Sequence, residues 1–292
     1  MWSPGTLGKL TNAFVGLSKA IREAYSFICL NWSNEKDEIV LIGFSRGAFT
    51  VRCVAQFIEE VGLLTKSGLR HLPRLFKMWK CLKKVEDSKK PEGLEKMSLK
   101  DKCGILVDTL EKWGELWKGV EIEACAVWDT VSAIGFPMVA HIPQLPRTKY
   151  RTVGKTIPKN VKLAIQALAL DERRRHYKPM VWDEPQDPTK QTLIQCWFAG
   201  NHSDVGGGSK DMTLSHITLA WMIGQLTDKI QFNHKNLWAI TTTRSWSKPS
   251  PDDEPADKTP DPRMRNCKVV ARAPISSELR VYTHFKIYLD LC

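Results

Sequence analysis

An apolar run, a glycine-rich turn and an amphipathic helix follow one another directly within residues 39–61. Residues 39–42, IVLI, contain no polar side chain, which is typical of a central parallel strand buried on both faces. Residues 43–47, GFSRG, have the pattern G-x-S-x-G, and apolar residues at helical spacing follow them as far as Gly62. Because glycines let a strand and a helix approach closely, the pattern predicts a strained turn that exposes the Ser45 side chain. The alternative is an ordinary tight turn in which Ser45 caps the helix.

Further strands and helices are expected to alternate along the chain. Strands are predicted at residues 122–127 and 193–198, and helices at residues 17–30, 161–170 and 214–226. Such alternation implies a mostly parallel sheet covered by helices on both sides. The sequence therefore predicts an α/β fold, a three-layer sandwich like that of the α/β-hydrolases.

One catalytic domain is expected over residues 1–245, followed by an irregular tail over residues 246–292. Within the domain, residues 65–119 are highly charged and mostly helical in pattern, with a break at residues 91–93. This segment is interpreted as a lid-like insertion over the sheet. The tail begins with residues 247–262, which are rich in Pro, Asp, Lys and Ser and can bury little apolar surface.

A serine hydroxyl becomes a nucleophile only when a neighbouring base takes its proton. Of the seven histidines, His202 is favoured because it follows the strand predicted at residues 193–198, where open parallel sheets carry their sites. Asp129 follows the strand predicted at residues 122–127 and gives the order Ser, Asp, His. Asp204 is the alternative acid. Because it lies only two residues beyond His202, its side chain could instead hold its own loop in place.

The oxyanion of an acyl-transfer intermediate needs backbone N–H donors. The residue after the nucleophile normally supplies one of them, here Arg46. The second donor should come from a loop after an earlier strand, but residues 1–37 are interpreted as a loop and one helix. The sheet is therefore expected to lack its first strand.

The chain is basic, with a formal net charge of +11, and many of its cations gather between Lys66 and Lys90. A solvated helical face is the simplest interpretation. The other is peripheral contact with an anionic membrane. Nucleic acid is not expected as a partner, because the eleven tryptophans are scattered and form no stacking platform for bases. Nucleotide binding is not expected either, because residues 206–210 lack the spacing of a phosphate-binding loop.

The eight cysteines are spread singly, so the sequence predicts no metal cluster. No cofactor is expected either. No apolar run approaches the roughly 18 residues of a membrane span. No signal peptide is evident after Met1, and a cytoplasmic location is therefore expected.

Four segments of the chain resemble one known family. They are GFSRGA at residues 43–48, VWDTV at 127–131, ALDER at 169–173 and HSDVGGG at 202–208. In this order they resemble the type VI secretion phospholipase-effector-like catalytic domain. The resemblance implies an α/β-hydrolase fold and the phospholipase activity known for bacterial relatives, with Ser45, Asp129 and His202 at the catalytic positions.

The chain also departs from that family. Members of the family usually begin with a strand that ends in Asp-Gly-Thr, and they often have aspartate where this chain has His216.

The sequence leaves two hypotheses about function. The first is a serine ester hydrolase, a phospholipase or lipase acting on a lipid or ester substrate. The second is a catalytically impaired hydrolase-like scaffold that binds a lipid or protein partner.

Overall fold

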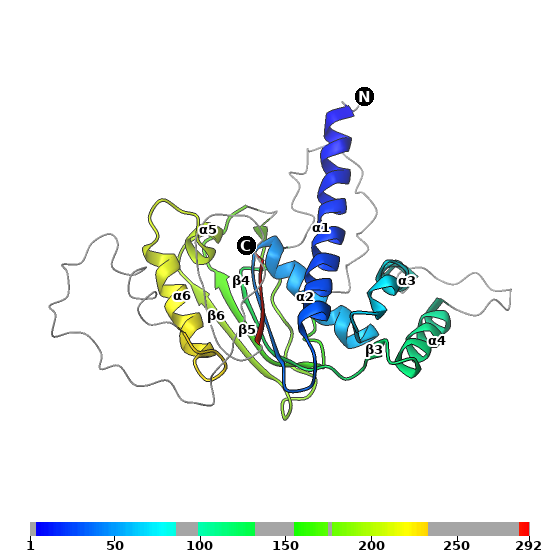
Figure 1. The fold of residues 1–292 in the computed structure, drawn as a ribbon. Coiled ribbons are helices and arrows are strands. Elements are labelled where there is room, and N and C mark those ends of the chain that lie inside the picture. The colour runs from blue at the N-terminus through cyan, green and yellow to red at the C-terminus, as the bar shows by residue number, and fades with distance from the viewer. Residues whose placement is uncertain (1–3, 86–98, 132–154, 175–176, 233–285, 292) are drawn as a thin grey trace.

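A sheet of five parallel strands forms the centre of the protein (Figure 1). The computed structural model describes residues 4–85, 99–131, 155–174, 177–232 and 286–291. In the order β6-β5-β4-β1-β7, the strands span Thr192–Phe198, Val161–Ala169, Ile122–Trp128, Glu38–Phe44 and Lys286–Leu291. Because these strands all run the same way, their carboxyl ends meet at one edge, where open α/β sheets carry their sites.

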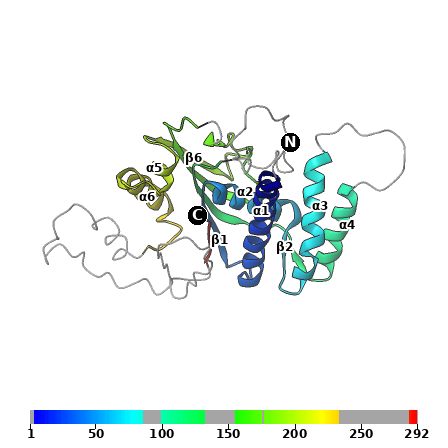
Figure 2. The same ribbon diagram turned by 90° about the horizontal axis from the view of Figure 1, so that it is seen from above.

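Helices cover both faces of the sheet, as Figure 2 shows from above. Successive side chains of a strand point to opposite faces, so β1 contributes to two cores. Ile39 and Leu41 pack in the core with α1 and α2, whereas Val40 packs in the core with α5 and α6. These helices are α1 (Pro4–Asn31), α2 (Arg46–Val61), α5 (His202–Gly206) and α6 (Thr213–Leu226). The predicted α/β-hydrolase-like fold is confirmed, and α1 begins well before the predicted start of its helix.

Residues 65–119, interpreted from the sequence as a lid-like insertion, contain helices, and two short strand segments flank them. The described elements of this region are β2 (Leu63–Leu64), η1 (Gly68–His71), α3 (Leu72–Val85), α4 (Leu99–Lys112) and β3 (Leu116–Trp117). The Phe57 ring of α2 contacts the rings of Phe76 and Trp79 of α3, with centroids 5.5 and 5.0 Å apart. Figures 1 and 2 show α3 and α4 beyond the carboxyl end of α2, whereas Ser45 precedes its amino end. The break predicted at residues 91–93 lies outside the described residues.

The helix predicted at residues 161–170 is wrong, because Val161–Ala169 is strand β5 in the interior of the sheet. Its apolar residues fit a helical period, and three of its nine residues are alanine, the best helix former. A strand buried on both faces needs apolar side chains on each side and so shows no alternation. Ile165 and its alanines are almost completely buried between the two cores.

The C-terminal tail is not irregular throughout, because residues Lys286–Leu291 form β7. This strand pairs in parallel with β1, on the side opposite β4. A segment from the C-terminal part of the chain thus supplies the strand on this side of β1. The register sets Leu291 opposite Gly43, so β7 ends beside the turn that carries Ser45. A six-residue strand after a long polar stretch gives little periodic signal, and residues 247–262 lie outside the described residues.

Candidate active site

Ser45 lies on the turn between β1 and α2 with φ of 58° and ψ of −118°. Residues with a side chain rarely adopt this conformation, which costs about 1–3 kcal/mol. The Ser45 N–H donates to the carbonyl of Trp128 at 3.0 Å, which anchors the turn to β4. A Cβ at Gly43 would lie 2.8 Å from Gly47 C and Ala48 N, so only glycine fits there. The predicted turn is present, and the Ser45 side chain does not cap α2.

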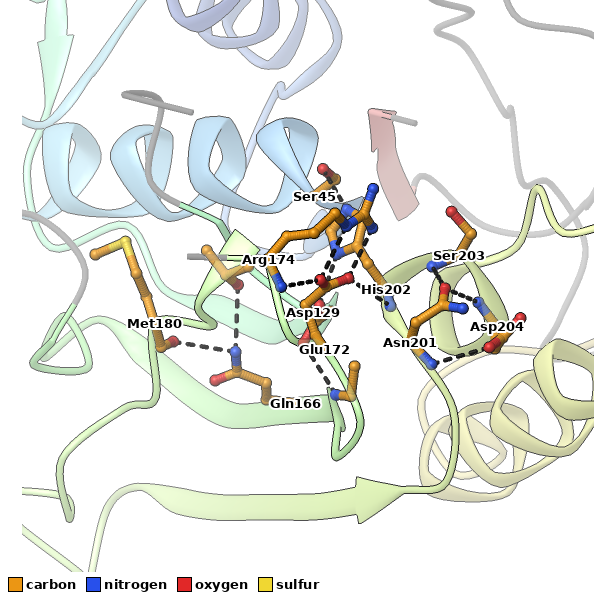
Figure 3. Close-up of polar contacts among 12 residues, drawn as sticks. Ser45, Asp129, Gln166, Glu172, Arg174, Met180, Asn201, His202, Ser203 and Asp204 are labelled. Carbon is orange, nitrogen blue, oxygen red and sulfur yellow. Dashed lines mark hydrogen bonds and ion pairs between the residues drawn. The ribbon is translucent and has the colours of Figure 1, made fainter. Parts of the chain in front are cut away.

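The structure brings Ser45, His202 and Asp129 together from three separate parts of the chain (Figure 3). Ser45 Oγ lies 2.7 Å from His202 Nε2, and His202 Nδ1 lies 2.6 Å from Asp129 Oδ2. His202 is 4% exposed and Asp129 is 0% exposed. An Nδ1–H that donates to the carboxylate leaves Nε2 as the acceptor for the Ser45 hydroxyl proton.

The Asp129 carboxylate is held in position by β5. Asp129 follows β4 with φ of 39°, and its N–H donates to the carbonyl of Ala167 at 2.8 Å. Its Oδ1 accepts the N–H of Ala169 at 2.9 Å, while Oδ2 faces the imidazole. Both oxygens therefore have defined donors, which fixes the plane of the carboxylate.

Two aromatic rings enclose the His202 imidazole. The Phe44 ring lies 4.6 Å away at 33°, and the Tyr177 ring lies 4.9 Å away at 65°, measured between centroids and ring planes. A Cβ at Gly206 would lie 2.0 Å from the Phe44 ring, which explains a glycine at this point of α5. The rings exclude water from the imidazole and so strengthen its hydrogen bonds.

Asp204 supports its own loop and does not contact the imidazole (Figure 3). Asp204 Oδ2 accepts the Asn201 N–H at 2.9 Å, and the Asn201 side chain accepts the N–H groups of Ser203 and Asp204 in return. Ser209 Oγ donates to Asp204 Oδ1 at 2.5 Å. The hydrogen bond from Ser209 is the main cause that lowers the pKa of Asp204, and the bond from the Asn201 N–H is the next. Of the two candidate acids, Asp129 is the one at the imidazole.

Glu172 and Arg174 also belong to this site, although the sequence suggested no role for them. Glu172 accepts the His202 N–H at 3.3 Å and Arg174 Nε and Nη2 at 2.9 and 2.7 Å. The hydrogen bond from Arg174 is the main cause that lowers the pKa of Glu172 to about 2. The Arg174 guanidinium in turn lies 3.9 Å from the centre of the Tyr177 ring. The available signal was the ALDER segment, in which Glu172 lies.

Arg52 of α2 binds the segment that contains Met180 and Trp182. Its Nη1 donates to the carbonyl of Met180 at 2.7 Å, and its guanidinium lies 3.9 Å from the Trp182 ring centre. Gln166 Nε2 also donates to the Met180 carbonyl at 3.1 Å, and the Met180 N–H donates to Thr130 O at 2.8 Å. Burial lowers the pKa of Arg52 to about 9. These bonds tie the loop after β4 to both α2 and β5.

Arg46 is the first residue of α2, directly after Ser45. The first N–H groups of a helix have no intrahelical partner and carry its positive end.

Within the described residues, no three His, Cys, Asp or Glu side chains are grouped as metal ligands. None of the described helices is long and apolar enough to cross a membrane.

The three-layer fold and the arrangement of Ser45, His202 and Asp129 define an α/β-hydrolase-like protein. Residues 6–225 match the family described as "T6SS, Phospholipase effector Tle1-like, catalytic domain". The chain belongs to this family, as the resemblance predicted. It is also 29% identical over 181 residues to "Uncharacterized protein YEL023C" of Saccharomyces cerevisiae. That alignment covers 62% of this chain and 24% of the yeast protein, so the chain spans about a quarter of this relative's length.

Proposed function

We propose that the chain hydrolyses acyl esters of lipids, with Ser45 as the nucleophile. The observation that carries the proposal is the continuous hydrogen-bond chain from Ser45 Oγ through His202 to Asp129, with steps of 2.7 and 2.6 Å. Membership of a phospholipase effector family supports a lipid as the substrate.

In the first half of the proposed reaction, His202 Nε2 takes the hydroxyl proton while Ser45 Oγ attacks the acyl carbonyl carbon. The Asp129 carboxylate stabilises the imidazolium that forms. The Arg46 N–H at the start of α2 donates to the oxyanion of the tetrahedral intermediate. As the intermediate collapses, the ester bond breaks and the imidazolium gives its proton to the departing alcohol.

In the second half, water hydrolyses the acyl-enzyme. His202 Nε2 takes a proton from water, and the resulting hydroxide attacks the acyl carbon. The second tetrahedral intermediate releases the fatty acid, and the Ser45 oxygen recovers its proton from His202. The cycle consumes one ester and one water and leaves the protein unchanged.

The test is covalent labelling together with turnover. A fluorophosphonate probe is expected to label the parent chain once, at Ser45, and the parent is expected to hydrolyse a soluble phospholipid. Ser45→Ala should lose both, whereas Ser67→Ala, a change at an exposed serine outside the site, should keep both. A parent that is folded but neither labelled nor active would contradict the proposal and favour the scaffold that binds a lipid or protein partner.

The proposal includes contact with an anionic lipid surface through α3. Arg74 and Lys77 are exposed on this helix. Arg22 of α1 and Lys80 of α3 lie 5.9 and 5.1 Å from the centre of the Phe76 ring. This basic face, Arg22, Arg74, Lys77 and Lys80, has the charge that complements acidic head groups.

A further inference from the structure

A polar pocket of about 420 Å³ opens beside His202. Two segments line it, the one that follows β5 and the one that follows β6. Asn201 and Ser203, the chain neighbours of His202, lie in its wall, together with Arg173 and Arg174. The pocket therefore adjoins the proposed catalytic base and is lined by groups that suit a polar part of a substrate.

Both carboxylates of this pocket accept hydrogen bonds from the protein. Asp171 Oδ2 accepts the Gly200 N–H at 2.7 Å. Glu172 accepts the His202 N–H, the Arg174 backbone N–H and two guanidinium nitrogens of Arg174. The side chain of Glu172 is 2% exposed. Asp171 is exposed and contributes a negative charge to the wall, but Arg173 and Arg174 are exposed as well, so a ligand meets two guanidinium groups and one carboxylate.

The Arg174 guanidinium is fixed in orientation. Its Nε and Nη2 donate to Glu172, and its face lies on the Tyr177 ring at 3.9 Å from the ring centre. A guanidinium has five N–H groups, so those that do not bond to Glu172 form a second edge. The side chain of Arg174 is 52% exposed, so this edge is accessible. A rigid guanidinium edge matches two oxygens of a phosphate at once.

Arg174 is linked to the His202 backbone through Glu172 and to the imidazole through Tyr177. Glu172 Oε2 accepts both Arg174 Nη2 and the His202 N–H (Figure 3). The Tyr177 ring contacts both the Arg174 guanidinium and the His202 ring. A phosphate held by Arg174 would therefore lie beside the proton-transfer site, as a head-group phosphate lies beside an acyl ester across a glycerol unit.

Resting on the proposed ester hydrolysis, we propose that Arg174, with Arg173 as a second cation, binds the phosphodiester of the substrate's alcohol portion. These arginines thus select phosphate-bearing esters over uncharged glycerides. Arg174 is a specificity residue in this scheme, and Glu172 is the residue that positions it.

The experiment compares two soluble substrates with the same acyl chains, dihexanoylphosphatidylcholine and dihexanoylglycerol. Arg174→Gln is expected to lower kcat/KM for the phospholipid about 10- to 100-fold, chiefly through KM, and to leave the glyceride nearly unchanged. For Arg174→Lys, kcat/KM on the phospholipid should lie between the values of the parent and of Arg174→Gln, because an ammonium keeps the charge but does not make the bidentate contact. Lys190→Gln removes an exposed cation that does not line the pocket and should preserve the substrate preference. An equal loss on both substrates would overturn the proposal, since it would mean that Arg174 only supports the His202 loop.

A binding measurement separates this proposal from the proposed catalysis. Glycerophosphocholine, which has a phosphodiester but no acyl ester, is titrated calorimetrically into the parent and into Arg174→Gln. Binding by the parent that the variant loses supports the subsite, even if Ser45 is not labelled and the proposed hydrolysis fails. No binding by the parent, or inorganic phosphate binding as tightly as the diester, would overturn the subsite.

Discussion

At the scale of single residues, the two candidate acids Asp129 and Asp204 have different roles in the folded site, although the sequence does not distinguish them. Asp129 and Asp204 both follow predicted strands, yet only Asp129 meets the imidazole, while Asp204 bonds to Asn201 and Ser209. The difference arises from strand register and from a local capping box, which form only when the chain has folded. Substitution of each acid in turn is therefore the direct test of their duties.

Asp129→Asn is expected to lower kcat by roughly four orders of magnitude in steady-state hydrolysis of a soluble ester. An amide N–H that faces His202 Nδ1 favours the tautomer with the proton on Nε2, which does not accept the Ser45 proton. Asp204→Asn is the matched control and should cost about 1 kcal/mol of stability, with a rate close to that of the parent. Comparable rate losses in the two variants would argue against the assignment of Asp129.

Glu172 is expected to give stability a specific dependence on pH. The Arg174 hydrogen bond is the main cause that lowers its pKa from 4.5 to about 2 in the folded chain. Because the folded pKa lies below the unfolded one, this stabilisation is complete above about pH 4.5 and is lost as the pH falls toward about 2. The gap in unfolding free energy between the parent and Glu172→Gln should therefore narrow across that window in urea titrations. Glu35→Gln, at an exposed position, is the control, and a gap for Glu172→Gln that stays constant with pH would refute the idea.

At the scale of elements, the sequence predicts best where one local pattern determines the structure. The strand, turn and helix around Ser45 lie close to their predicted bounds, because a buried run, two glycines and a helical stripe all act within residues 38–61. The alanine content of β5 predicts a helix, but pairing with its neighbours β4 and β6 overrides that preference and makes the segment a strand.

Long-range partners explain the other parts of the fold and site that the sequence does not predict. The pairing of β7 with β1 joins residues at opposite ends of the chain, for which no local pattern exists. Glu172 acquires its role only when β5 places it beside the loop that carries His202. Both features depend on the assembled sheet, so no local spacing gives their partners, although the ALDER segment marks the position of Glu172.

Gly43→Ala is expected to destabilise the protein by about 1–3 kcal/mol, measured by urea unfolding. The new Cβ would lie 2.8 Å from backbone atoms of α2, so the turn must shift. Fluorophosphonate labelling of Ser45 should slow in parallel, because the same turn aims its hydroxyl at His202. Gly104→Ala is the matched control, since a Cβ there has no neighbour within 4 Å, and it should stabilise α4 by up to about 1 kcal/mol. A Gly43→Ala protein as stable and as readily labelled as the parent would contradict the tight contact.

At the scale of the whole molecule, the charge of +11 is unevenly distributed. Several described cations are paired, for example Lys162 with Glu121 and Glu123. Within the described part of the chain, Arg74 and Lys77 on the exposed side of α3 have no acidic partner. Uncompensated cations near an anionic bilayer contribute about 1 kcal/mol each. Because α3 lies beyond the carboxyl end of α2 and Ser45 precedes its amino end, a surface that binds lipid through α3 would act apart from the residues of the proposed hydrolysis.

The double variant Arg74→Gln and Lys77→Gln is expected to bind vesicles of 30% phosphatidylserine about 30-fold more weakly than the parent in co-sedimentation. Parent binding should weaken as sodium chloride rises from 0.05 to 0.5 M, because added salt shortens the distance over which exposed charges attract each other, which is roughly 10 Å at 0.1 M. The matched control replaces two other exposed lysines, Lys36 and Lys190, with glutamine, so net charge falls equally. Hydrolysis of soluble dihexanoylphosphatidylcholine should be the same in all three proteins, because none of these side chains touches Ser45, His202 or Asp129. If the control pair weakens binding as much as the α3 pair, net charge alone drives association and α3 is not a defined lipid-binding face.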